Sequence, residues 1–129
     1  MTDGDLGRIG IRVVSLLQRS DFNRIENEFE YALSHGRPAG KAIEEDLNRA
    51  IVESGNIGSL DEEKIELKVS HFGSNASQLR SLVECYCQFS EGGGILVELI
   101  LPESGGVYIE DITSYRSSRE HIQSELDNA

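Results

Sequence analysis

The chain has 129 residues, with 23 acidic and 12 basic side chains and a formal net charge of −11 at pH 7. A negative field of this size repels nucleic acid and anionic membranes, so we expect neither as a partner, whereas it attracts basic proteins. The length predicts a single domain over residues 1–129, which is large enough to bury a core without disulfide or metal staples.

The sequence also bears on where the protein works. Its start lacks the basic and then apolar segment of a secretion signal, and apolar runs such as Leu99–Leu101 are far too short to span a membrane. Two cysteines without such a signal fit a reducing compartment, where thiols stay free. We therefore expect a soluble protein of the cytoplasm.

Three helices are predicted in the first half of the chain. Apolar residues at helical spacing predict the first over about Leu6–Arg19. A second helix begins after Ser20 or Asp21 and ends at Gly36, because glycine favours a helix stop. Its apolar stripe consists of Phe22, Ile25, Phe29 and Leu33. The third helix spans about Ala39–Glu53.

From Lys64 onward the apolar period changes to two, which is typical of strands with one buried face. The predicted strands are Lys64–Phe72, Leu82–Phe89, Ile95–Leu101 and Val107–Thr113. Short glycine-rich connectors, SEGGG and PESGG, favour hairpin turns between the later strands. The predicted fold is therefore α+β: three N-terminal helices followed by a four-stranded antiparallel meander and a short C-terminal helix over Ser118–Leu126.

The two cysteines, Cys85 and Cys87, fall on the same side of a predicted strand. Residues two apart on a strand have side chains roughly 6.8 Å apart, whereas a disulfide needs about 3.8 Å between the Cβ atoms. A zinc site needs four ligands, and the chain offers only His35, His71 and His121 beside this pair. We expect two buried thiols that act as small apolar groups, and no metal site.

Motifs for catalysis are missing from the sequence. It contains no nucleophile elbow, phosphate-binding loop or dinucleotide fingerprint, and the glycines at 92–94 lie between two predicted strands. His71 and Asp111 would form a base and its orienting carboxylate if their strands were neighbours. Both residues lie near strand ends, where polar groups are commonly solvated, so we expect no catalytic residue, no cofactor and no enzyme activity.

Negative charge is concentrated in the strand-rich half of the chain. Residues 81–115 contain six acidic residues and neither lysine nor arginine. The outward face of the predicted meander mixes carboxylates with apolar groups: Glu66, Lys68, Phe72, Glu84, Tyr86, Gln88, Leu96, Glu98, Ile100, Tyr108, Glu110 and Ile112. Such a mixture suits a basic protein, because tyrosine rings anchor interfaces and glutamates pair with arginine or lysine.

We predict that this outward face binds the partner. The predicted partner-binding residues are Glu84, Tyr86, Glu98, Tyr108 and Glu110. A second candidate surface is the acidic turn that leads into the first strand, formed by Asp61, Glu62 and Glu63. The alternative is that the C-terminal helix or a second subunit covers the apolar members of the face, and that the acidic residues serve solubility.

Two segments carry resemblances to known families. The segment VVSLLQRSDFNRIENE resembles the opening of nuclear-transport-factor-like (SnoaL-like) α+β domains, and ILVELILPESGGVYIEDI is similar to the closing hairpin of small bacterial domains found beside polymorphic toxins. In size, acidity and order of elements, the whole chain resembles bacterial toxin-immunity proteins, including those of contact-dependent growth inhibition. That family has no universal sequence signature, so no residue roles are carried over.

These resemblances imply different functions. The immunity family implies an inhibitor that binds a cognate basic toxin domain of the nuclease type and blocks its active site, as a monomer or weak homodimer. The transport-factor-like family implies a small-ligand or enzymatic domain, whose pocket would be lined by His71, Asp111 or Tyr31. A third interpretation is a scaffold or oligomerisation module. A solid core with carboxylates grouped on an outer surface would favour binding over catalysis.

Overall fold

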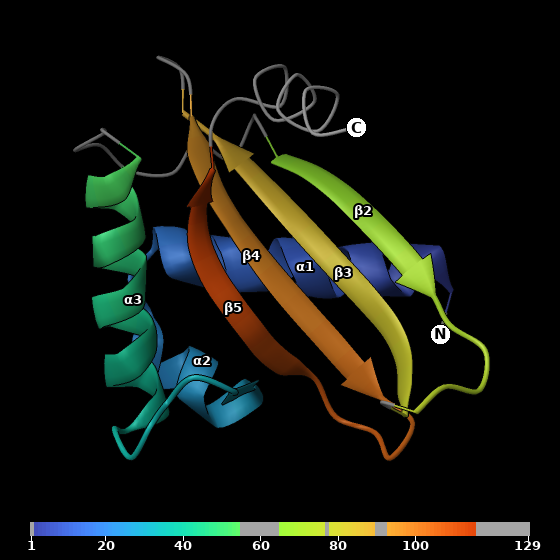
Figure 1. The fold of residues 1–129 in the computed structure, drawn as a ribbon. Helices are drawn as coiled ribbons and strands as arrows, with labels where there is room; N and C mark the ends of the chain where they lie inside the picture. Colours follow the sequence, from blue (N-terminus) through green and yellow to red (C-terminus); the bar gives the residue numbers. More distant parts are fainter. Residues whose placement is uncertain (1, 55–64, 77, 90–92, 116–129) are drawn as a thin grey trace.

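The computed structural model describes residues 2–54, 65–76, 78–89 and 93–115 (Figure 1). The predicted C-terminal helix Ser118–Leu126 and the acidic turn Asp61–Glu63 lie outside these ranges. The described helices are α1 (Asp3–Gln18), α2 (Phe22–Glu28) and α3 (Ala39–Glu53). The described strands are β1 (Glu30–Tyr31), β2 (Ile65–His71), β3 (Leu79–Gln88), β4 (Gly94–Pro102) and β5 (Tyr108–Tyr115). None of these helices is long and apolar enough to cross a membrane.

The strands form one mixed sheet in the order β1-β5-β4-β3-β2. Each of the pairs β2–β3, β3–β4 and β4–β5 is antiparallel, which confirms the predicted four-stranded meander. The sheet also contains β1, which the sequence did not predict and which pairs with β5 in parallel. The α+β class is confirmed, but the sheet has five strands and is not purely antiparallel.

The second helix is shorter than predicted, and the prediction that it reaches Gly36 is wrong. It ends at Glu28, and Phe29 is extended, with φ −136° and ψ 150°. The chain then runs beside β5, where Glu30 donates its amide to the carbonyl of Val107 at 3.3 Å. Strand formation prevails because the edge of β5 offers backbone partners and because Phe29 and Tyr31, two residues apart, are both buried.

The helix α1 crosses one face of the sheet, which we call the inner face (Figure 1). It begins with a capping box, in which the Thr2 hydroxyl accepts the Asp5 amide and the Asp5 carboxylate accepts the Thr2 amide. The helix comes close to the strands at Gly10, where a Cβ atom would lie only 3.0 Å from Cys85 Sγ. A side chain at this position would force α1 away from the sheet.

The hydrophobic core lies between the helices and this inner face. The buried side chains of α3 include Ile43, Leu47 and Ala50, and α3 contacts β5, β4 and β1. Inward-pointing residues of β3 and β4, such as Val83 and Leu99, are fully buried. Among the described elements no helix lies over the opposite face, which we call the outer face and which Figure 1 presents to the viewer.

Candidate protein-binding face of the sheet

Strand register arranges the outer-face residues in rows that run across the strands. One row consists of Lys68, Glu84, Glu98 and Asp111, which are consecutive Cα partners on β2, β3, β4 and β5. We call Glu84, Glu98 and Asp111 the acidic row. Neighbouring strands lie about 4.8 Å apart, so three carboxylates follow one another at close spacing. No ion pair with a described cation neutralises any of the three.

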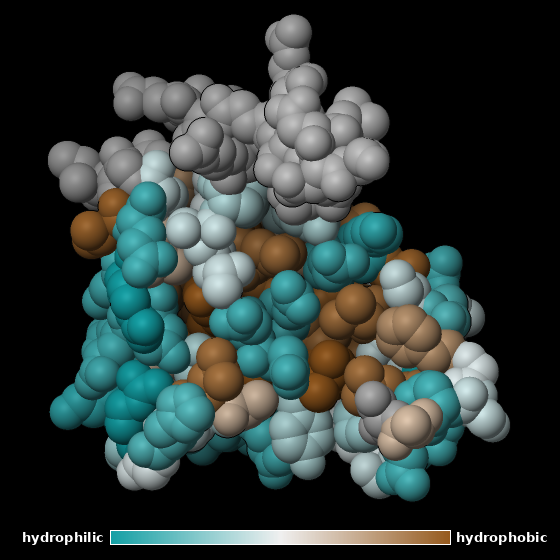
Figure 2. All heavy atoms as spheres, viewed as in Figure 1, coloured by the Kyte–Doolittle hydropathy of each residue, from teal (hydrophilic) through white to brown (hydrophobic). Residues whose placement is uncertain are grey.

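Apolar side chains lie on both sides of the acidic row. Leu82 pairs with Ile100 and Ile100 with Tyr108 on one side, while Tyr86 pairs with Leu96 on the other. All five are half-buried. Figure 2 shows this face, where hydrophobic and hydrophilic residues are interspersed over the strands. The result is a charged stripe between two apolar margins.

A β-bulge changes which residues of β5 reach the outer face. Glu98 pairs with Asp111 and Leu99 pairs with Ile109, so Glu110 is an extra residue without a partner. Ile112 is consequently turned into the core, where it is 5 % exposed. The prediction that Ile112 shares the outer face with Tyr108 is therefore wrong. Glu110 is exposed at the bulge, and Asp111 is the residue of β5 that pairs with Glu98 in the acidic row.

The sequence contains a signal for this bulge. The buried residues Ile109 and Ile112 are three positions apart, whereas a regular strand repeats every two. Of the predicted partner-binding residues, the structure places Glu84, Tyr86, Glu98 and Tyr108 at half-buried outer positions and Glu110 at the exposed bulge. Their role in binding stays a prediction. The turn Asp61–Glu63 lies in a part of the chain that is not described.

The middle carboxylate of the acidic row has perturbed titration. Partial burial, together with the negative charges of Glu84, Asp111 and Glu110, raises the pKa of Glu98 above its usual value. Both causes disfavour the ionised form, the first by removing water and the second by like-charge repulsion. The free protein therefore holds a charge in a place where that charge is unfavourable.

Hydrogen bonds and ring contacts fix the aromatic residues of the face. The Tyr86 hydroxyl donates to Glu84 Oε2 at 2.9 Å, and the Tyr86 ring meets the Tyr115 ring edge to face with centroids 5.5 Å apart. At the other margin, the Glu30 carboxylate beside the Tyr108 hydroxyl raises the pKa of Tyr108. Because these rings are held in place, a partner would not have to order them on binding.

Both cysteines are fully buried on the inner face and neither is bridged, as the sequence predicts. Burial raises the pKa of the Cys85 thiol and of the Cys87 thiol to about 12. Such thiols are protonated at neutral pH and are poor nucleophiles. Within the described ranges, no group of three or more His, Cys, Asp or Glu residues is arranged to hold a metal ion.

The three residues considered for a catalytic pocket do not meet. His71 lies on β2, where Nε2 is 2.5 Å from Asp3 Oδ1 and Nδ1 is 3.1 Å from Ser81 Oγ. Asp111 lies on β5, and β3 and β4 separate the two strands. Tyr31 lies on β1, beside β5 at the other edge of the sheet, and its side chain is buried. The hypothesis of a His71 and Asp111 pair is therefore wrong.

Tyr31 belongs to a polar network that the sequence did not reveal. Its hydroxyl donates to Asp46 Oδ2 at 2.5 Å, and Arg37 donates to both Asp46 oxygens and to the backbone carbonyls of Leu33 and Ser34. Burial favours the neutral carboxyl, but these hydrogen bonds from Tyr31 and Arg37 hold the pKa of Asp46 below its usual value. The network fixes the loop between β1 and α3 and has a structural role.

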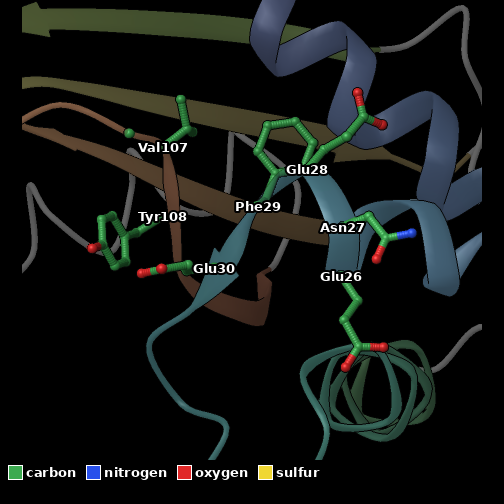
Figure 3. A pocket seen from close by; sticks show the side chains of 8 residues that line it. Glu26, Asn27, Glu28, Phe29, Glu30, Val107 and Tyr108 are labelled. Carbon is green, nitrogen blue, oxygen red and sulfur yellow. The ribbon is translucent and has the colours of Figure 1, made fainter.

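A groove of about 320 Å³ lies between the α2–β1 segment and the turn that precedes β5 (Figure 3). It carries three glutamates, but their side chains diverge. Glu26 points toward α3, Glu28 pairs with Arg12 of α1 at 3.0 Å, and Glu30 lies beside Tyr108. Without convergent polar groups, the groove does not resemble a small-ligand or catalytic site.

These observations leave the acidic row and its apolar margins as the candidate site. Comparison with known proteins adds no further assignment. No protein-family model matches the chain, and neither the curated proteins nor the solved structures include a significant match.

Proposed function

We propose that this protein binds a cationic protein through the outer face of its sheet. The observation that carries the proposal is the acidic row, three carboxylates on adjacent strands that form no ion pair with a described cation and that have apolar margins. An enzyme would instead need convergent groups in a pocket, and the candidate residues for such a pocket lie apart.

The repulsion within the acidic row of the unbound protein supports a binding role. Adjacent like charges across a sheet destabilise the fold, and a cationic partner would offset that cost on binding. The margins suit the same partner, because arginine and lysine lay their aliphatic stems along apolar surface while the charged ends reach carboxylates. Tyr86 and Tyr108, one in each margin, are candidates for anchor residues.

We further propose that the partner is a basic toxin domain of the nuclease type and that the protein acts in the cytoplasm as its immunity protein. A nuclease is basic where it holds phosphates, so an acidic face competes for the same surface. Inhibition then requires only tight binding and no chemistry. The net charge of −11 would also speed association with such a partner.

The test uses a toxin domain encoded beside the gene for this chain, or else a protein captured from the native host with the immobilised chain. Binding is measured by calorimetry for the wild type and for Glu98→Gln. We expect the substitution to weaken binding by about 2 to 5 kcal/mol if the charge pair is buried in the complex.

The matched control is Glu103→Gln, because Glu103 is exposed in the turn after β4 and lies away from the acidic row. It should leave the affinity unchanged. Should Glu98→Gln bind as tightly as the control, the outer face is not the interface, and the acidic turn Asp61–Glu63 becomes the next surface to test.

A further inference from the structure

The strand β2 forms one edge of the sheet, and within the described residues no strand pairs with its outer side. Phe72 donates its amide to the carbonyl of Arg80 at 3.0 Å, and hydrogen bonds in an antiparallel pair involve alternate residues. The backbone groups that face the open edge are therefore those of Ile65, Leu67, Val69 and His71. An edge of this kind is ready to pair with another strand.

The side chains of β2 do little to protect this edge. The acidic residue Glu66 and the basic residue Lys68 point to the outer face and are exposed. The strand contains no proline. On the inner side, an apolar groove of about 320 Å³ is lined by Ile65 and Leu67 of β2 and by Ile11, Ser15 and Gln18 of α1. Ile11 is 52 % exposed, which is unusual for a large apolar residue beside the core.

We propose that β2 pairs antiparallel with β2 of a second copy of this chain, around a two-fold axis beside Leu67. In this register Glu66 lies opposite Lys68 of the partner subunit, and the reverse pair forms on the other side of the axis. The backbone groups of Ile65, Leu67 and Val69 are those that face the open edge, so they make the hydrogen bonds between the copies.

Charge selects this register over its neighbours. An axis beside Glu66 would place two glutamates opposite each other, and an axis beside Lys68 would place two lysines opposite each other, which is destabilising. An axis beside Val69 would leave both charged residues opposite uncharged ones. The axis beside Leu67 is the one among these that satisfies both charges, and such self-complementarity is what a two-fold interface requires.

The apolar groove beside Leu67 also favours a second copy of this chain as the partner. A two-fold axis perpendicular to the sheet keeps both α1 helices on the inner side, so the groove beside Leu67 in one copy faces the groove of the other. The exposed Ile11 side chains then lie where each can be buried by the partner subunit. The pairing extends the sheet across the two copies and leaves both acidic rows on the same outer side.

The experiment measures the mass of the full chain by analytical ultracentrifugation as its concentration rises to about 0.5 mM. We expect the mass to approach twice the chain mass of 14.3 kDa. Glu66→Lys and Lys68→Glu should each weaken the dimer by about tenfold or more, because each converts two attractive pairs into repulsive ones. Ile11→Asp should also weaken it.

Mixing the two charge variants gives the decisive result. In the mixed dimer every pair at the axis is again of opposite charge, so an equimolar mixture should dimerise about as tightly as the wild type. Glu53→Lys, the same charge change at an exposed position on α3, is the matched control and should dimerise normally. Thermal melts establish that each variant is folded.

Three results would overturn the inference. The first is a wild-type chain that stays monomeric at the highest concentration, as would occur if another segment of the same chain covered the edge. The second is a dimer that is indifferent to the charge and Ile11 variants, since it would use another surface. The third is a mixture of folded charge variants that fails to dimerise, since the register would then be wrong. None of these results bears on the acidic row.

Discussion

Removing the charge of Glu98 should stabilise the free protein, because this carboxylate lies between Glu84 and Asp111. Partner residues on adjacent strands are about 5 Å apart, and two unit charges at that distance repel by about 0.8 kcal/mol in water and about 3 kcal/mol at the dielectric typical of a protein surface. Glu98 is half-exposed, so solvent screening favours the lower end of this range. We expect Glu98→Gln to gain about 1 to 2 kcal/mol near neutral pH.

The stability difference between Glu98→Gln and the wild type should depend on pH. A glutamate whose pKa is raised on folding binds its proton more tightly in the folded state, so its contribution is most favourable below the unfolded pKa of about 4.3 and is lost as pH rises through the folded value. The advantage of Glu98→Gln over the wild type should therefore be small near pH 4 and full near about pH 8.

The assay is thermal unfolding of both proteins across this pH range, where the expected gain corresponds to about 3 to 6 °C in Tm at the alkaline end. Glu103→Gln serves as the control, because its side chain lies in an exposed turn. If Glu98→Gln and the wild type unfold alike at every pH, or if the control gains as much, repulsion within the acidic row is not a cost to the fold.

Two further predictions concern the core. Neither Cys85 nor Cys87 should react with a thiol reagent in the native protein, and replacing both with serine should cost about 1 to 3 kcal/mol each without changing partner affinity; rapid native labelling would contradict their burial. Gly10→Val should destabilise by about 1 to 3 kcal/mol in denaturant titrations, because the new side chain meets Cys85 Sγ, whereas Gly4→Ala, which meets only flexible atoms of Arg8 and Thr2, should be neutral or stabilising.

Much of the architecture could be predicted from periodicity. The third helix begins and ends at the predicted residues, Ala39 and Glu53, because a helical apolar stripe lies between a proline and a glycine. Strands β4 and β5 lie within one or two residues of their predicted bounds, since glycine-rich turns separate them. Local sequence sufficed wherever one apolar pattern and its stop signals agreed.

Periodicity failed where a tertiary contact decided the structure. Phe29 fits both the stripe of a continuing helix and a strand, and the open edge of β5 determines which one forms. The partnership of Tyr31 with Asp46 joins residues 15 positions apart and has no local signature. Asp111 was missed as a member of the acidic row for a related reason, because its side depends on the bulge at Glu110.

The bulge means that β5 holds one residue more than its pairing with β4 requires. Deleting Glu110 would leave Leu99 opposite Ile109 and Glu98 opposite Asp111 in regular alternation, so Asp111 would stay on the outer face and Ile112 in the core. Deleting Ile112 would instead remove a buried side chain and reverse the side on which Thr113 and the later residues of the strand lie. A single-codon deletion should therefore be far less damaging at Glu110 than at Ile112, and families of related chains should tolerate a gap at Glu110 as well as variety there.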